Sequence, residues 1–357
     1  MKKLLKWYII VPLIAWVFFF LDIPELQALL HILKTILLLG CVIAAVHHSE
    51  VIAQRVGEPF GTIVLAIAIT IIEVALIISL MLAGGEKALY LARDTVFAAV
   101  MIILNAIIGV CLLVGSFKYK EQFFEIKSVN TALVSLISIV VFTLVLPNFT
   151  TSLLEPKYTT PQLFFAAFAC LIIYGTFLLI QTVRHRNYFE PVKVESSAGQ
   201  VTKPLAQNNI YVSVLFLLVC LTIVVLLAKS LSPLIEETII ANNLPQALVG
   251  IIIALVVLLP EGLAAVKAAV RNDIQTSLNL SFGSALAAIG LTIPSVSIVS
   301  YIYDIDIILG LERKSLVLLA LSLFIVMISL NRGKTNILYG VVLIINFLAF
   351  IITTIFP

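Results

Sequence analysis

Long uninterrupted runs of apolar residues, separated by short polar segments, make up most of the chain. A helix needs about 20 apolar residues to cross a bilayer, whereas the strands of a membrane barrel are about 10 residues long and alternate in polarity. These runs are long and do not alternate, so they predict transmembrane helices. We expect eleven spans, near residues 7–22, 29–49, 61–83, 94–115, 129–147, 162–183, 209–228, 245–266, 277–301, 315–330 and 335–356.

The two most N-terminal spans are less regular than the rest. Lysines at positions 2, 3 and 6 precede the first span, but no small-residue cleavage pattern follows it, so we expect an uncleaved helix and not a secretory signal. His31 and Lys34 lie inside the second span. The pattern also allows this second helix to continue past residue 49 toward Arg55.

The longest polar segment, residues 184–209, has the proline, glycine, serine and lysine content of a flexible linker. It predicts four regions: residues 1–28 with the N-terminal span and first outer loop, a five-helix repeat at 29–183, a cytoplasmic linker at 184–209, and a second five-helix repeat at 210–357. Because five is odd, the two repeats must have opposite orientations in the membrane, as in many secondary transporters. The predicted fold is all-α and integral to the membrane, with one N-terminal helix and two inverted five-helix repeats.

Composition excludes a soluble protein. The chain is 62% hydrophobic and 11% charged, against about 25% charged residues in a typical soluble domain. The net charge is +3, but the basic residues are dispersed among loops and predict no nucleic-acid binding. They are more numerous in the segments that share a side with the N-terminus, which predicts a cytoplasmic N-terminus. The cysteines lie in apolar spans without paired spacing and are interpreted as packing residues: Cys41, Cys111, Cys170 and Cys220.

One glutamate lies in the middle of each of two apolar spans, Glu73 in the third and Glu261 in the eighth. A charged side chain near the bilayer centre costs about 2.5–3.5 kcal/mol on insertion scales, so it is normally retained for an ion or proton path. Each glutamate falls in the second helix of its predicted repeat, which predicts that the two share one site. The alternative is that each is protonated and only packs or hydrogen-bonds between helices.

Residues that distort helices or permit close packing accompany both glutamates: Gly57, Pro59, Gly61, Gly250, Pro260 and Gly262. Pro260 lacks a backbone donor and frees a carbonyl one turn earlier. Carboxylates with such carbonyls make an oxygen site suited to Ca²⁺, Na⁺ or K⁺. Other polar residues in the spans can complete this site or can join helices by hydrogen bonds: Thr70, Asn105, Asn279, Ser281 and Ser284.

A pair of ionised carboxylates in a low-dielectric core is unfavourable when empty and is tolerated when a cation or protons neutralise it. If only neutralised pairs pass between inward-facing and outward-facing forms, the cation and the proton compete for one site. Antiport follows from that competition.

Titratable residues near the predicted membrane surfaces are candidates for gating or pH sensing: His47, His48, Glu58, Arg93 and Asp94. The Arg93–Asp94 pair can gate the outer mouth of the fourth span, or it can be a plain interfacial ion pair. Histidine titrates near neutral pH, so the two histidines can sense cytoplasmic pH. Solvated histidines at the interface are the alternative.

Four segments carry a resemblance to a known family: HHSEVIAQRVGEPFGTIVLAIAITIIEVALI from His47, RDTVFAAVMIILNAIIGV from Arg93, LPEGLAAVKAAVRNDIQTSLNLSFGSALAAIGLTIP from Leu259, and GKTNILYG from Gly333. In these segments, their order and their spacing, the sequence resembles the cation/proton exchanger family of the calcium/cation antiporter superfamily. Within that family it is most similar to the bacterial ChaA-type calcium/proton or sodium-potassium/proton antiporters.

The resemblance implies an eleven-helix exchanger in which two inverted halves enclose one site. The two acidic residues of the family fall on Glu73 and Glu261, as cation ligands and proton carriers. Its fourth-helix asparagine falls on Asn105, and its ninth-helix Gly-Ser pair falls on Gly283 and Ser284.

The sequence also departs from the eukaryotic members of that family. Thr70 and Leu258 stand in place of the two signature asparagines, Gly262 in place of a histidine and Ala287 in place of a glutamine. The predicted site therefore has fewer neutral oxygens than that of a dedicated calcium exchanger.

We predict a secondary active antiporter that exports Ca²⁺, or else Na⁺ or K⁺, in exchange for protons by alternating access. Its partners are expected to be inorganic cations, protons and the lipid bilayer, with no cofactor, and the resemblance implies the bacterial inner (plasma) membrane. The alternatives are a Na⁺(K⁺)/H⁺ antiporter without calcium transport, a passive cation channel, and a membrane-embedded metal-dependent enzyme. The chain has no HExxH, GxSxG or Walker-type motif, and it has few of the intramembrane polar residues that a channel needs.

Overall fold

The structure is a computed structural model. It describes residues 6–21, 26–57, 63, 70, 73–75, 77–78, 81, 88–150, 155–190, 210–242, 245 and 247–356. Over these residues the regular secondary structure is helical, and the β structure is limited to an isolated bridge between Phe123 and Lys334. The predicted all-α class is confirmed.

The α-helices follow one another along the chain as α1 (Trp7–Phe20), α2 (Gln27–Val56), α4 (Ala88–Met101), α5 (Ile108–Tyr119), α6 (Ile126–Val140), α7 (Thr160–Leu179), α8 (Ile210–Ala241), α9 (Ala247–Val270), α10 (Ile274–Tyr303), α11 (Arg313–Leu330) and α12 (Ile337–Ile355). Segments of π-helix are η3 (Ile102–Ile107), η4 (Val141–Val145) and η6 (Ile180–Arg184), and short 3₁₀ segments are η5 (Leu146–Phe149) and η7 (Arg186–Tyr188). The η3 segment joins α4 and α5 into one continuous span, Leu89–Tyr119.

Within the described residues, 9 helices are long and apolar enough to cross a membrane, and α1 is a shorter apolar helix. Each matches a span predicted from the sequence. The remaining prediction, at residues 61–83, falls mostly outside the described residues. Helix α2 continues to Val56, as the pattern allowed.

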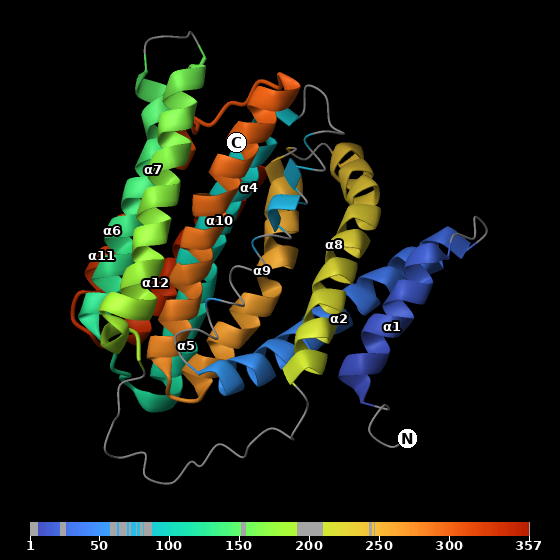
Figure 1. The fold of residues 1–357 in the computed structure, drawn as a ribbon, viewed down its shortest axis with the longest axis horizontal. Coiled ribbons are helices and arrows are strands. Elements are labelled where there is room, and N and C mark those ends of the chain that lie inside the picture. The colour runs from blue at the N-terminus through green and yellow to red at the C-terminus, as the bar shows by residue number, and fades with distance from the viewer. Residues whose placement is uncertain are drawn as a thin grey trace.

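Helices from the two predicted repeats pack against each other in matching pairs. Helix α7 packs on α10, and α12 packs on α5, while α2 and α8 lie together with α1 beside them. Figure 1 shows α9, α10, α4 and α5 between the α1–α2–α8 group and the group containing α6, α7 and α11. If the repeats are superposed in order, the α7–α10 contact is the counterpart of the α12–α5 contact. In each contact the last helix of one predicted repeat packs on the third helix of the other, as two inverted repeats would produce. The repeat boundaries at 29–183 and 210–357 stay a prediction.

Local signals fix the ends of several helices. The side chain of Asp273 caps α10 by accepting a hydrogen bond from Thr276 N at 3.1 Å, and a capping box of Thr159 and Gln162 begins α7. Both satisfy backbone donors that the first turn of a helix leaves free. The left-handed residue Asp304 ends α10.

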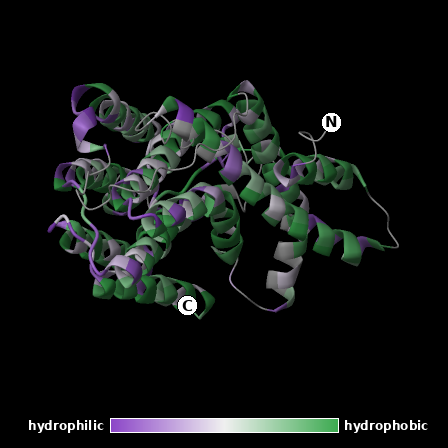
Figure 2. Cartoon of the chain, turned by 90° about the horizontal axis from the view of Figure 1, so that it is seen from below, coloured by the Kyte–Doolittle hydropathy of each residue, from purple (hydrophilic) through white to green (hydrophobic). Residues whose placement is uncertain are grey.

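The outer surface of the bundle is apolar. Large hydrophobic side chains such as Phe165 and Phe168 on α7 and Phe324 on α11 are more than half exposed, and Figure 2 shows hydrophobic residues along most of the helices. A soluble monomer rarely exposes so much apolar surface, so these faces are expected to contact lipid.

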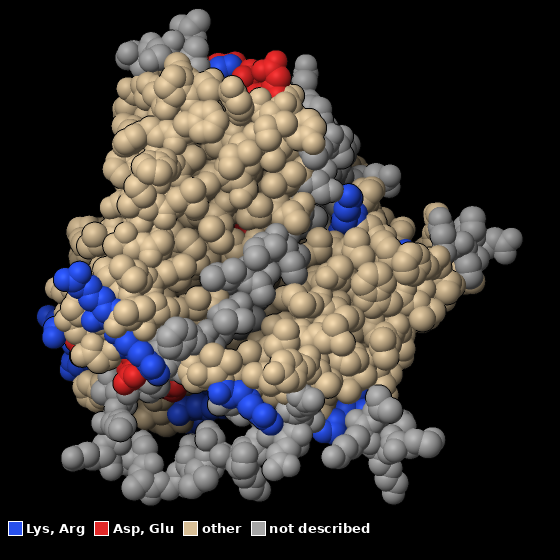
Figure 3. All heavy atoms as spheres, in the orientation of Figure 1, with Lys and Arg blue, Asp and Glu red and all other residues tan. Residues whose placement is uncertain are grey.

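Charged side chains lie mainly at the two ends of the bundle. Figure 3 shows Lys and Arg gathered along the lower edge, where α1 begins and where α5, α7 and α9 end. Residues at this end include Lys118, Lys127, Arg184 and Lys267. The broad band between the two ends is mostly uncharged on this face, apart from basic side chains at its left and right sides.

Candidate functional site

Glu73 and Glu261 are brought together inside the bundle. Each side chain is 3% exposed, and the two carboxyl groups are close enough to interact electrostatically. They come from different predicted repeats, Glu73 from the described part of the third span and Glu261 from the middle of α9. The structure therefore places both predicted carboxyl groups in one buried locus.

Ser284 on α10 completes part of this locus. Its Oγ donates a hydrogen bond to Oε2 of Glu261. Among the described residues, Oε1 of Glu261 and Oε1 of Glu73 have no hydrogen-bond partner. Buried polar atoms are nearly always paired, so a free oxygen on each of two interacting carboxyl groups is available to a ligand. A cation or protons would satisfy both.

The backbone of α9 is adapted around Glu261. Pro260 lies inside the helix and has no N–H to donate to Val256 O, so that carbonyl lacks its usual helical partner. Gly262 allows close packing on the π-helical segment η3, because a Cβ at this position would lie 3.3 Å from Cδ1 of Ile107. Near Glu261, α9 thus has a backbone carbonyl without its helical donor five residues before the glutamate, and a close contact with η3 at the residue after it.

The other predicted polar residues have different surroundings. Thr70, three residues before Glu73, is 1% exposed. Ser281 donates to the carbonyl of Ser277 in its own helix. Asn279 Nδ2 donates to Phe189 O at 2.7 Å, and its Oδ1 accepts from Gln275 Nε2 at 2.9 Å. The predicted site residues on α10 are Asn279, Ser281, Gly283 and Ser284. Of these, Ser284 is the one that is hydrogen-bonded to a glutamate in the described structure.

Asn105 lies in η3, where its amide contacts α11 and α12. Its Nδ2 donates to Ser322 Oγ at 2.9 Å, and its Oδ1 accepts from Asn346 Nδ2 at 2.9 Å. Ser322 and Asn346 follow it in the sequence by 217 and 241 residues. No local pattern in the sequence could have paired them with Asn105.

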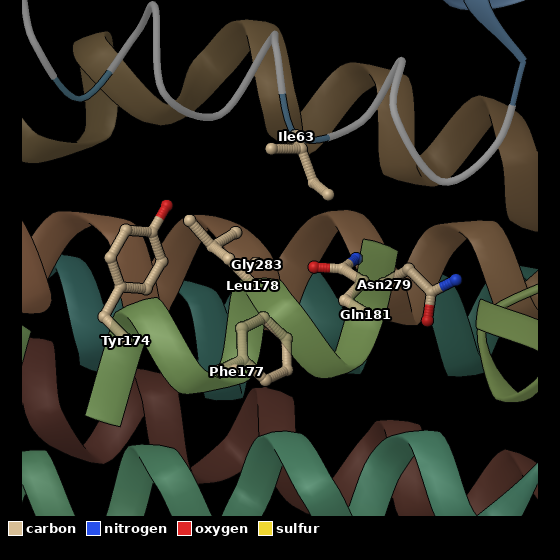
Figure 4. Close-up of a pocket in the computed structure, with 7 residues that line it drawn as sticks. All are labelled: Ile63, Tyr174, Phe177, Leu178, Gln181, Asn279 and Gly283. Carbon is tan, nitrogen blue, oxygen red and sulfur yellow. The ribbon is translucent and has the colours of Figure 1, made fainter. Parts of the chain in front are cut away.

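Helix α7, the segment η6 and helix α10 form a pocket together with Ile63, which points toward them from the third span (Figure 4). Its lining residues are Ile63, Tyr174, Phe177, Leu178, Gln181, Asn279 and Gly283. Within the described structure, the buried Oε1 of Gln181 has no hydrogen-bond partner. Gly283 in this lining precedes Ser284, which donates to Glu261, so this pocket lies next to the glutamate locus. Sequence reasoning did not identify Tyr174 or Gln181, because a tyrosine and a glutamine in a transmembrane span carry no motif.

The predicted gating pair forms an ion pair at the end of the bundle opposite the N-terminus. Arg93 Nε lies 2.7 Å from Asp94 Oδ1, and Arg93 Nη1 donates to Gly310 O at 3.2 Å. The hydrogen bond to Gly310 O ties α4 to the segment between α10 and α11.

The two histidines lie on α2 and pack against α1, and His48 also packs against α8. The ring of His47 stacks on Tyr8 at 4.0 Å, and His48 stacks on Phe216 at 5.6 Å and approaches Tyr8 O with its Nε2 at 3.3 Å. His48 is 1% exposed, so it is not a solvated interfacial residue. Glu58, the remaining candidate of this group, lies outside the described residues.

The part of the chain that the structure describes has no cluster of three or more His, Cys, Asp or Glu side chains. All four cysteines are free and buried. The glutamate locus therefore offers two carboxyl groups and the hydroxyl of Ser284. These hard oxygen donors suit alkali and alkaline-earth cations better than thiophilic metals.

Comparison with known proteins agrees with this geometry. The model of the sodium/calcium exchanger protein family matches residues 26–183 and 212–356. The chain belongs to this family. It is accordingly a multi-pass membrane transporter and not an enzyme, as the sequence predicted.

Two curated relatives match over nearly the whole chain. One is an ionic transporter of Sinorhizobium fredii, 42% identical over 355 residues, which are 98% of this chain and 96% of the relative. The other is the sodium-potassium/proton antiporter ChaA of Escherichia coli, 32% identical over 353 residues, covering 97% and 95%.

Among solved structures, native YfkE superposes with a TM-score of 0.68 over 92% of both chains at 18% identity. A second structure of that protein names it a Ca²⁺/H⁺ antiporter. At this identity the likeness establishes the fold.

Proposed function

We propose that this protein exchanges a cation for protons by alternating access, with Glu73 and Glu261 as the shared cation ligands and proton carriers. The observation that carries the proposal is that two buried carboxyl groups from different predicted repeats are close enough to interact electrostatically, and that each retains an oxygen without a hydrogen-bond partner among the described residues. An isolated structural glutamate would need neither the second carboxyl group nor a free oxygen.

The charge of the pair supplies the coupling. Two ionised carboxylates within the hydrophobic core are unfavourable unless a bound cation or protons neutralise them. The conformational change is then accessible to the cation-loaded and the protonated forms and not to the empty ionised form. Net movement of cations in one direction requires movement of protons in the other.

Ca²⁺ is our first candidate cation, because one Ca²⁺ neutralises two carboxylates, as two protons do. Na⁺ and K⁺ are the second, because the locus has few neutral oxygens to complete the higher coordination number that Ca²⁺ prefers. The named relatives include both chemistries: ChaA is a sodium-potassium/proton antiporter and YfkE a Ca²⁺/H⁺ antiporter. No resident cofactor takes part in this proposal.

We place the protein in the bacterial inner membrane with its N-terminus in the cytoplasm. The basic residues along the edge where α1 begins support this orientation, because cytoplasmic loops carry an excess of Lys and Arg. Export then carries cations from the α1-start end of the bundle to the end where α12 terminates.

Proton flux in everted membrane vesicles tests the proposal. A pH-sensitive dye reports on proton movement while Ca²⁺, Na⁺ and K⁺ are added separately, for the wild-type protein and for Glu73→Gln and Glu261→Gln. We expect cation-driven proton movement in the wild type and none in either variant. Glu190→Gln, which changes an exposed glutamate paired with Arg186, is the matched control and should exchange normally. Full exchange by Glu73→Gln or Glu261→Gln would contradict the paired site.

A further inference from the structure

A compact polar cluster lies in the hydrophobic interior, built from three different helical segments. It consists of Asn105 on η3, Ser322 on α11 and Asn346 on α12, which are 0%, 0% and 4% exposed. Asn105 is hydrogen-bonded to both Ser322 and Asn346. In addition, Asn346 Nδ2 donates to Ser322 Oγ at 2.8 Å, so each residue is bonded to the other two. The Ser322 hydroxyl donates in turn to Leu318 O at 2.7 Å.

This cluster supports a local break in the α-helical pattern. The span α4–η3–α5 becomes π-helical at Ile102–Ile107, and Asn105 Nδ2 donates to Met101 O at 3.1 Å. The side-chain amide thereby bonds the carbonyl that Asn105 N would bond in a regular α-helix. π-Helical segments of this kind occur often at functional sites.

The same segment contacts the helix that carries Glu261. Ile107, the last residue of η3, lies against Gly262, where an added Cβ would be 3.3 Å from Ile107 Cδ1. Gly262 is the residue after Glu261, and α9 packs on both η3 and α5. A continuous series of contacts therefore runs from Ser322 and Asn346 through Asn105 and η3 to Glu261.

We propose that Ser322 and Asn346 are positioning residues for exchange. They hold Asn105 in place, and Asn105 in turn maintains the π-helical conformation of η3. Helix α9 packs against η3 in this conformation, which places Glu261 within hydrogen-bond reach of Ser284. The inference rests on the proposed exchange at the glutamate pair. It differs from completion of the cation site, which the sequence allowed for Asn105, because the Oδ1 of Asn105 is already bonded to Asn346.

The alternative is that the cluster only joins helices, as buried serines and asparagines do in many membrane bundles. The two roles differ in what they change. Helix joining affects stability and the amount of folded protein, whereas positioning of Glu261 affects the cation concentration at half-maximal exchange.

The test compares Ser322→Ala and Asn346→Leu with Thr354→Val in the vesicle assay and in thermal unfolding of purified protein. Thr354 is a buried α12 residue whose hydroxyl bonds only its own helix in the described structure, at Phe350 O. Loss of one or two cluster hydrogen bonds should raise the half-saturating cation concentration about fivefold to tenfold. The control should not change it. Ser322→Thr, which keeps the hydroxyl, should restore a value near that of the wild type.

If the wild type is active and Ser322→Ala and Asn346→Leu have its half-saturating cation concentration, the inference is overturned and the proposed function stays intact. A lowered melting temperature with unaltered half-saturation would do the same, since it would mean helix joining alone. A wild-type protein that moves no cation would overturn the proposed function and this inference with it.

Discussion

The hydroxyl of Ser284 on α10 donates a hydrogen bond to Oε2 of Glu261 on α9. This contact fixes one oxygen of the carboxyl group and leaves the other, Oε1, without a partner in the described structure. A carboxyl group held on one side and free on the other is preorganised for a ligand. Orientation by Ser284 is therefore expected to matter for cation affinity.

Removal of this hydroxyl should weaken cation binding. A hydrogen bond to a charged group contributes about 1.5–3 kcal/mol, so Ser284→Ala should raise the half-saturating cation concentration at least about tenfold. The measurement is exchange as a function of cation concentration in everted vesicles. Ser297→Ala removes another buried α10 hydroxyl, which bonds Ile293 O of its own helix, and should leave the concentration unchanged. Equal behaviour of the two variants would show that Ser284 does not orient Glu261.

The contact between α5 and α12 should tolerate no side chain at Gly340. A Cβ there would lie 2.6 Å from Leu113 N and 2.8 Å from Gly109 O. Because both are backbone atoms, the helices would have to separate, and overpacking of this kind costs about 1–3 kcal/mol. Gly340→Ala should therefore lower the melting temperature of the purified protein. Gly175→Ala is the control, since a Cβ at Gly175 meets nothing within 4 Å; equal melting temperatures would contradict the predicted close approach.

Asp273, in the turn between α9 and α10, should make stability depend on pH. Burial raises the pKa of this carboxyl group above its ordinary value, while the hydrogen bond from Thr276 partly opposes the shift. A raised folded-state pKa means that the group favours folding at low pH and that this contribution is lost as the pH rises through the folded-state pKa.

Asp273→Asn keeps a capping oxygen and carries no charge. We expect it to melt at the same temperature as the wild type near about pH 4 and at a higher temperature near about pH 8. Thermal unfolding across this range measures the difference. An asparagine variant that becomes less stable than the wild type as the pH rises would reverse the predicted sign.

The fold followed from the sequence because its dominant signal is local. Runs of about 20 apolar residues can only be helices in a bilayer, so the spans were placed correctly wherever the structure describes them. Glu73 and Glu261 were found for a related reason, since an acidic residue inside such a run is conspicuous without any knowledge of its neighbours.

Contacts between distant helices could not be predicted in the same way. Two turns of α10 carry three polar residues that the sequence does not distinguish: Asn279, Ser281 and Ser284. In the described structure only Ser284 is hydrogen-bonded to Glu261. The face that each presents depends on how α10 packs, which a single sequence does not reveal. Asn105 could likewise be proposed as a polar intramembrane residue, whereas its partners Ser322 and Asn346 depend on the packing of η3 with α11 and α12.

The most direct test of the central claim is whether cation binding displaces protons from the glutamate pair. Purified wild-type protein in weakly buffered solution, mixed with Ca²⁺, Na⁺ or K⁺ in turn, should release protons on addition of the transported cation. Glu73→Gln and Glu261→Gln should each release far fewer, because one proton carrier and cation ligand is lost. Proton release that is undiminished in both variants would show that the protons come from elsewhere and that the paired-glutamate account is wrong.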